Sequence, residues 1–130
     1  MSENFNLEII SPDNTIFKSE VIEVTIPAFE GLMSILKDHI SLVTFLRPGF
    51  VLAQTKEGIK KFYVEEGTVE FSKNELLILS STVKNAEDLS QDKINQMIMD
   101  TKKEIINDNI SDKDKYILSY KIETLSEISQ

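Results

Sequence analysis

Apolar and polar residues alternate with a period of two through the first half of the 130-residue chain. Such alternation predicts β-strands with one buried face, because successive side chains of a strand point to opposite sides of the sheet. The alternating apolar positions are Phe5, Leu7 and Ile9; Ile22, Val24 and Ile26; Phe50 and Leu52; Phe62 and Val64; and Val69 and Phe71. The run from Leu76 to Leu79 is apolar throughout, which predicts a strand covered on both faces.

Turn-forming residues separate these runs and then stop. All prolines and glycines of the chain fall within the first 67 positions. The turn signals are Pro12-Asp13-Asn14, Pro48-Gly49, Lys56-Glu57-Gly58 and Ser72-Lys73-Asn74. Strand-length pieces spaced in this way favour antiparallel pairing in a sandwich or barrel. We expect this all-β part to close near residue 84.

From about Asn85 the apolar spacing changes to three and four residues, which is typical of one face of an α-helix. Ser90 is a suitable N-cap for a first helix, and Ser111 with Asp114 three residues later predicts the start of a second. The first apolar stripe consists of Ile94, Met97, Ile98, Thr101 and Ile105. The second consists of Leu118, Ile122 and Leu125, flanked by Ile117 and Ile128.

The short polar link between these helices predicts an antiparallel hairpin. Neither helix is stable alone, because isolated helices of about 15 residues are marginal in water. Each needs the other helix, the β-structure or a partner protein. Two interpretations stay open: the hairpin is docked permanently on the β-structure, or it moves between two surfaces and acts as a switch.

Charge and composition exclude several classes of function. The formal net charge of −8 opposes nucleic-acid binding, which requires clustered Lys and Arg. No stretch approaches the roughly 18 uninterrupted apolar residues of a membrane-spanning helix, so we expect membrane association only through a protein partner. The chain has no Cys and a single His, His39, so no zinc site is predicted and the cytoplasm is the expected compartment.

Only Asp38, His39 and Ser41 bring together the residue types of a hydrolase. Residues 38 and 39 point in opposite directions in extended backbone, so the acid is badly placed to orient the imidazole. The chain also lacks a glycine-rich phosphate loop and a Gly-x-Ser-x-Gly motif. We therefore predict no catalytic residue, no cofactor and no metal. A small hydrolase that uses His39 and Ser41 is the weaker rival interpretation.

The segment from Pro27 to Gly49 is rich in apolar residues but contains the polar trio Lys37-Asp38-His39. A loop that carries Phe29, Leu32 and Met33 beside a turn glycine exposes apolar surface unless something covers it. The segment therefore indicates a protein partner.

The same segment carries a motif. Its residues are Pro27, Gly31, Ile35-Leu36, His39, Leu42-Val43-Thr44, Leu46 and Pro48-Gly49. In order and spacing they resemble the ATP synthase epsilon subunit family, the counterpart of the mitochondrial delta subunit. The resemblance covers the whole chain and includes Leu7-Glu8-Ile9-Ile10-Ser11-Pro12 and Gly67-x-Val69-Glu70. It implies a ten-stranded sandwich over residues 1–85 and a two-helix domain over residues 86–130.

The resemblance implies a non-catalytic rotor subunit of the proton-translocating rotary ATP synthase. In that family the sandwich binds the gamma subunit and rests on the ring of c subunits, which couples rotation to ATP synthesis. By position, Ser11 and His39 correspond to residues that face gamma. The residues that correspond to the loop reaching the c ring are Phe29, Glu30, Gly31 and Leu32. The implied location is the cytoplasmic face of the bacterial inner membrane, as a peripheral part of the complex.

The chain departs from the family pattern at several positions. Ala28 and Ser34 replace glycines, which predicts a different backbone path for the loop. Glu65-Glu66 stands where Ser-Gly is frequent. Some bacterial members bind ATP through a helix-start motif with Asp and Arg. The matching stretch, residues 89–94, has Ser90 and Lys93 at those positions, so we expect no tight ATP binding.

In the family the helical domain can extend into the alpha/beta catalytic head and inhibit ATP hydrolysis. Residues 86–130 of this chain hold six lysines and ten acidic residues. This balance weakens attraction to an acidic surface, so we expect transient contact with the head and modest inhibition. The main rival interpretation is an acidic adaptor that binds some other protein, and binding to gamma separates the two.

Overall fold

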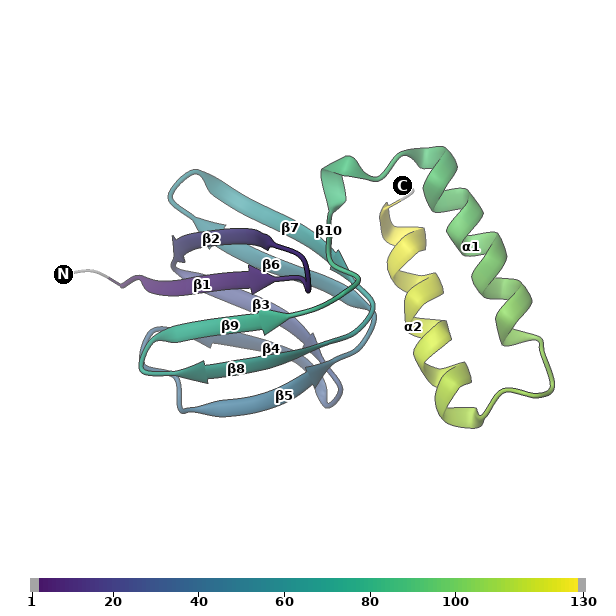
Figure 1. Cartoon of the computed structure of the whole chain (residues 1–130), viewed down its shortest axis with the longest axis horizontal. Coiled ribbons are helices and arrows are strands. Elements are labelled where there is room, and N and C mark those ends of the chain that lie inside the picture. The colour runs from purple at the N-terminus through teal and green to yellow at the C-terminus, as the bar shows by residue number, and fades with distance from the viewer. Residues whose placement is uncertain (1–2, 129–130) are drawn as a thin grey trace.

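Ten strands and two helices make up residues 3–128, the part of the chain that the computed structural model describes (Figure 1). The first five strands are β1 (Phe5–Ile10), β2 (Thr15–Val21), β3 (Glu23–Ala28), β4 (Gly31–Leu36) and β5 (Leu42–Leu46). The others are β6 (Gly49–Thr55), β7 (Gly58–Val64), β8 (Gly67–Ser72), β9 (Glu75–Leu79) and β10 (Lys84–Asn85). A short 3-10 turn (Ala86–Asp88) leads to α1 (Gln91–Ile105) and α2 (Asp112–Ile128).

The strands form a sandwich because one continuous sheet folds over on itself. Their hydrogen-bonded order is β10-β7-β6-β3-β5-β8-β9-β1-β2, with β4 added to β3. A single pair, Ala28 with Leu46, joins β3 to β5 and marks the fold between the two layers. The predicted sandwich of about ten strands is confirmed, with one difference in pairing. β1 runs parallel to β9, whereas we expected antiparallel neighbours throughout.

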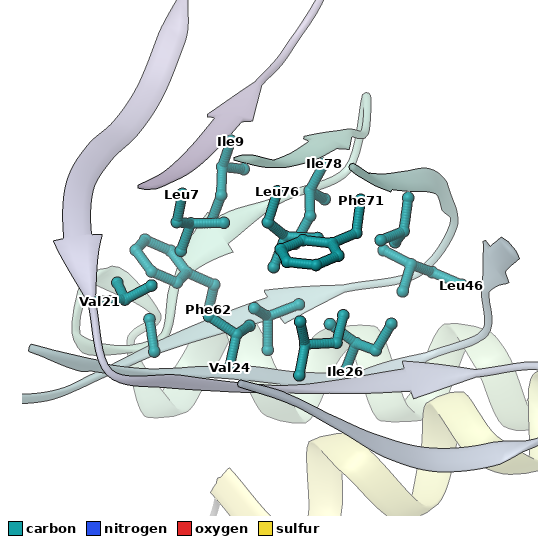
Figure 2. Packing of buried hydrophobic residues seen from close by; sticks show 14 of the residues in the cluster. Leu7, Ile9, Val21, Val24, Ile26, Leu46, Phe62, Phe71, Leu76 and Ile78 are labelled. Carbon is teal, nitrogen blue, oxygen red and sulfur yellow. The ribbon is translucent and has the colours of Figure 1, made fainter. Parts of the chain in front are cut away.

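The core lies between the two layers and follows the predicted alternation (Figure 2). Leu7 and Ile9 of β1 and Phe71 of β8 point inward from one layer. Val24 and Ile26 of β3 point inward from the other. All five side chains are at most 1% exposed, so this core accounts for most of the apolar burial that stabilises the sandwich.

Three sequence-based assignments are wrong in detail. Ile22 is a half-buried residue in the bend between β2 and β3, and the core-facing residue there is Val21. Phe50 and Leu52 do not face the sandwich core, because the core-facing residues of β6 are Val51 and Ala53. Phe50 instead packs against the helices on the opposite face. The run in β9 is not covered on both faces either, since its last residue, Leu79, is 44% exposed.

The two helices form the predicted antiparallel hairpin (Figure 1). Both predicted starts are confirmed, because the Ser90 Oγ accepts a hydrogen bond from the Lys93 amide at 3.2 Å and the Ser111 Oγ accepts one from the Asp114 amide at 3.1 Å. The hairpin packs on the face of β6 and β7 that points away from the sandwich core.

Gly67 lies where β8 passes close to β9, and an added Cβ there would lie 2.6 Å from the Leu79 carbonyl oxygen. Gly58→Ala is the matched control, because Gly58 also has a positive φ but no heavy atom lies within 4 Å of an added Cβ. We predict that Gly67→Ala lowers the free energy of unfolding by about 1–3 kcal/mol more than Gly58→Ala. Urea denaturation of both variants measures this, and equal losses would contradict the crowding argument.

Candidate partner interface

Apolar side chains of β5, β9 and β1 lie in register on one face of the sheet that these strands form with β8, and those of β5 and β9 are exposed. The strand pairing places Phe45, Thr68, Leu79 and Ile10 in one row across the four strands. Phe45 is 58% exposed, and Val43 in the neighbouring row is 73% exposed. We call these four strands the outer layer and this surface the outer face. Neighbouring exposed apolar residues of this kind are typical of a surface that binds another protein.

Ser11 and His39 lie at opposite ends of the outer layer. Ser11 follows the carboxyl end of β1, whereas His39 precedes β5. The pairing directions make β1 and β5 run the same way, so the end of one and the start of the other are far apart. A five-residue strand such as β5 spans roughly 16 Å. A partner that contacts both residues must therefore cover the length of the outer face.

At the first end, Ser11 fixes the turn between β1 and β2. Its amide donates to the Asn14 carbonyl at 2.9 Å, and its Oγ accepts a hydrogen bond from the Asn14 amide at 3.3 Å. The hydroxyl also lies 3.0 Å from the Asn14 Oδ1. The serine side chain is therefore part of the turn itself, as expected for a residue type that favours turns.

At the other end, Asn74 holds the loop that carries His39. The Asn74 Oδ1 accepts a hydrogen bond from the Asp38 amide at 2.7 Å, and its Nδ2 donates to the Asp38 carboxylate at 3.0 Å. The His39 Nδ1 lies 2.8 Å from the Ile40 carbonyl, and its ring meets the Phe71 ring edge to face at 6.0 Å. The Asp38 carboxylate thus contacts an amide rather than the imidazole, so it does not orient His39 as a general base.

The predicted contact loop is the hairpin between β3 and β4. Leu32 is 73% exposed and Phe29 is 36% exposed. Glu30 is also exposed, and its carboxylate accepts a hydrogen bond from the Thr44 Oγ1 at 3.1 Å. Gly31 has φ of +135°, a conformation that favours glycine. Leu32, Phe29 and Glu30 are consequently all exposed to a partner.

Ala28 and Ser34 lie in regular β-structure, and a loop path that differs from the family's stays a prediction. Ala28 pairs with Gly31, and Ser34 pairs with Thr25, in regular antiparallel register between β3 and β4. Both residues lie within strands, where any residue other than proline adopts the extended conformation easily. The glycine that the turn requires is Gly31.

Arg47 connects this loop to α2. Its Nε donates to the Ala28 carbonyl at 3.1 Å, and its guanidinium carbon lies 3.9 Å from the centre of the Tyr120 ring. Such a cation–π contact contributes about 0.5–2 kcal/mol, depending on how far it is shielded from water. The conformation of the loop and the position of α2 therefore share one side chain.

The apolar contact between the helical hairpin and the sandwich is small. Its buried residues are Tyr63 of β7, Leu89, Ile94 of α1 and Leu125 of α2. Tyr63 is fully buried, and its hydroxyl donates to the Glu65 carboxylate at 3.1 Å. Burial raises the pKa of the Tyr63 phenol above its ordinary value, and the Glu65 charge raises it further. The phenol therefore stays protonated and acts as a hydrogen-bond donor beneath the helices.

The stretch that matches the ATP motif lies beside a hollow of about 520 Å³ at the junction of sandwich and hairpin. Lys93 lines this hollow together with Lys84, Asp88 and Leu89. Ser90, at the position of the family's acid, caps α1 with its hydroxyl. The absence of tight ATP binding stays a prediction.

Neither a metal site nor a membrane span is found in the described part of the chain. No group of three or more His, Cys, Asp and Glu side chains among residues 3–128 could hold a metal ion. Of the helices in that range, none is long and apolar enough to cross a membrane.

Known proteins identify the family. Residues 4–86 match the family model described as the β-sandwich domain of the ATP synthase delta/epsilon chain. An ATP synthase epsilon chain from Pelagibacter ubique is 42% identical over 130 residues, which cover 99% of this chain and 100% of that relative. The chain belongs to the ATP synthase delta/epsilon family. The family predicted from the Pro27–Gly49 motif is thereby confirmed.

Other members of this family agree with the match. An ATP synthase epsilon chain from Rhizobium rhizogenes is 33% identical over 106 residues, 81% of this chain and 78% of the relative. Two solved mitochondrial ATP synthases contain chains with the same fold. In the OSCP/F1/c-ring structure from Euglena gracilis, the TM-score is 0.80 at 18% identity, with 100% of this chain and 84% of that chain covered. In the central stalk/c-ring structure from Tetrahymena thermophila, the TM-score is 0.69 at 14% identity, with 96% of each chain covered.

The sequence-based reasoning missed the outer face as a surface. Val43 and Phe45 were considered only as parts of the apolar segment from Pro27 to Gly49, and Leu79 was assigned to a covered strand. The signal was present, since Val43 and Phe45 fall on alternate positions of one short strand and so share a face. Which face points to the core could not be read from β5 alone, because both faces of this strand carry apolar residues.

We predict that Asn74→Gly loosens the His39 loop without unfolding the sandwich. Glycine keeps the positive φ of Asn74 but removes both hydrogen bonds to Asp38, so the Asp38 amide should exchange with solvent about tenfold faster or more. Lys73→Gly is the control, because Lys73 also has a positive φ. Amide hydrogen exchange measures this, and equal rates in both variants would show that the Asn74 side chain does not hold the loop.

Proposed function

We propose that this chain is a non-catalytic central-stalk subunit of a rotary ATP synthase, and that the outer face binds the gamma subunit. The observation that carries the proposal is a row of apolar residues in which Phe45 and Leu79 are exposed and Ile10 is half-buried, with the exposed Val43 beside it. Membership of the delta/epsilon family supports this assignment, and so does the fold shared with a chain of a solved central stalk. Ser11 and His39 are proposed to contact gamma at the two ends of the outer face.

The β3–β4 hairpin is proposed to rest on the c ring, with Phe29, Glu30, Gly31 and Leu32 as its contact residues. The exposure of Leu32 and Phe29 supports this assignment. Glu30 is exposed beside them, and a hydrogen bond from Thr44 holds its carboxylate. Through these two surfaces the chain would couple rotation of the c ring to ATP synthesis by a proton-translocating enzyme, at the cytoplasmic face of the bacterial inner membrane.

The two parts of the chain are assigned different roles. Residues 1–85 are proposed as the binding domain, and residues 86–130 as a regulatory domain that modulates ATP hydrolysis through transient contact with the alpha/beta head. No active site of its own is assigned to the chain. The hydrogen bond that the Asp38 carboxylate accepts from the Asn74 Nδ2 supports that assignment over a hydrolase built on His39 and Ser41.

Binding to gamma tests the first surface. We expect saturable one-to-one binding to the gamma subunit of the same organism, and at least tenfold weaker binding for Val43→Asp, because a buried interface penalises an unpaired charge. Ile59→Asp is the matched control, since Ile59 is 66% exposed but lies on β7, in the other layer. Isothermal titration calorimetry measures all three proteins.

The outcomes separate the candidate functions. Equal binding of the wild type and Val43→Asp would move the gamma contact away from the outer face. Complete absence of binding by the folded wild-type chain would favour the adaptor interpretation.

The second surface is tested in the assembled enzyme. We predict that Leu32→Asp lowers ATP-driven proton pumping relative to ATP hydrolysis while leaving the affinity for gamma unchanged, because Leu32 lies on the β3–β4 hairpin and not on the outer face. Fluorescence quenching in membrane vesicles measures pumping, with Ile59→Asp again as the control. Unchanged pumping would count against the c-ring contact of this loop.

A further inference from the structure

Glu65 bridges the sandwich and the helical hairpin. It lies in the turn between β7 and β8, where its amide donates to the Thr82 Oγ1 at 3.0 Å. One carboxylate oxygen accepts the hydrogen bond from the Tyr63 hydroxyl, and the other lies 3.1 Å from the Lys121 Nζ on α2. The Lys121 and Glu65 side chains are only 18% and 26% exposed, so this ion pair is shielded more than an ordinary surface pair.

Three lysines from three elements lie at the junction of the sandwich and the helices. Lys84 lies in β10, Lys93 in α1 and Lys121 in α2. The pKa of Lys84 is lowered first by burial and then by Lys93, with Lys121 acting in the same direction, whereas the Glu65 charge acts to raise it. Asp88 lines the same hollow as Lys84 and Lys93. The docked hairpin thus brings positive charge from both helices against a lysine of the sandwich.

The other attachments of the hairpin are few. The apolar contact is small, and the contact of Arg47 with Tyr120 is a single cation–π pair. A short two-helix hairpin that leaves this surface loses much of the support for its helices. The equilibrium between docked and undocked hairpin is therefore sensitive to one charge at the junction.

We propose that Glu65 is an electrostatic latch that holds the helical hairpin on the sandwich, by pairing with Lys121 and offsetting the repulsion among Lys84, Lys93 and Lys121. The latch acts between two parts of the same chain. Its test therefore does not depend on the partners assigned to the outer face.

Hydrogen exchange of the full chain tests the latch. Glu65→Gln keeps an acceptor for the Tyr63 hydroxyl but removes the charge. We expect amides of α1 and α2 to exchange about tenfold faster in this variant, while amides of the sandwich core keep their wild-type rates and report that the β-structure is intact.

Glu66→Gln is the matched control. It removes the same charge one residue away, but the Glu66 carboxylate accepts hydrogen bonds from the Ser81 amide at 3.0 Å and the Ser81 Oγ at 2.7 Å, within the sandwich. Wild-type helix exchange is expected for Glu66→Gln. Equal acceleration in both variants would overturn the specific role of Glu65.

Added salt and a second substitution distinguish an effect of the lost charge from an effect of altered packing. In Glu65→Gln, about 0.5 M salt should slow helix exchange towards the wild-type rate, because it screens repulsion between the remaining lysines. Adding Lys121→Gln to Glu65→Gln should also restore part of the protection. A Glu65→Gln variant that exchanges like the wild type, or whose faster exchange responds to neither change, would overturn the proposal.

Discussion

The architecture depends on one sheet layer that is packed on both of its faces. Along β7, Phe62 and Val64 point into the sandwich while Tyr63 points to the helices, so consecutive residues serve two different cores. Phe50 of β6 faces the helices beside Tyr63. The sandwich side of this layer is closed by the outer layer, whereas its other side offers only a small apolar platform. The order of the helical hairpin depends on that platform, because two short helices bury too little apolar surface by themselves.

Much of this arrangement could be predicted from local pattern. Strand positions follow from the alternation and from turn residues whose chemistry is specific, as at Lys73 and Asn74, which both have positive φ. Helix starts follow from Ser90 and Ser111, whose hydroxyls accept hydrogen bonds from backbone amides. The orientation of β6 was misassigned because the larger residue, Phe50, belongs to the smaller core. Size and hydrophobicity identify a buried face but not which of two cores it enters.

The candidate interface could be predicted only in part, because it depends on contacts between segments that are distant in sequence. The exposed loop between β3 and β4 was recognisable from the composition of its own segment. The outer face needs the register of β5, β8, β9 and β1, which no single segment contains. The role of Glu65 likewise depends on a distant segment, since one of its partners, Tyr63, lies two residues away and the other, Lys121, lies on α2.

The parallel pairing of β1 with β9 sets an order of events during synthesis. Asn6 pairs with Glu75 and Ile10 with Leu79. One edge of β1 therefore stays without a neighbouring strand until β9 has been synthesised. A contact between such distant segments closes slowly, because the intervening chain must be ordered first. The helices follow β9 in the chain, so they are the last elements to become available for packing. A nascent chain interrupted before β9 would leave the edge of β1 unpaired and open to other chains.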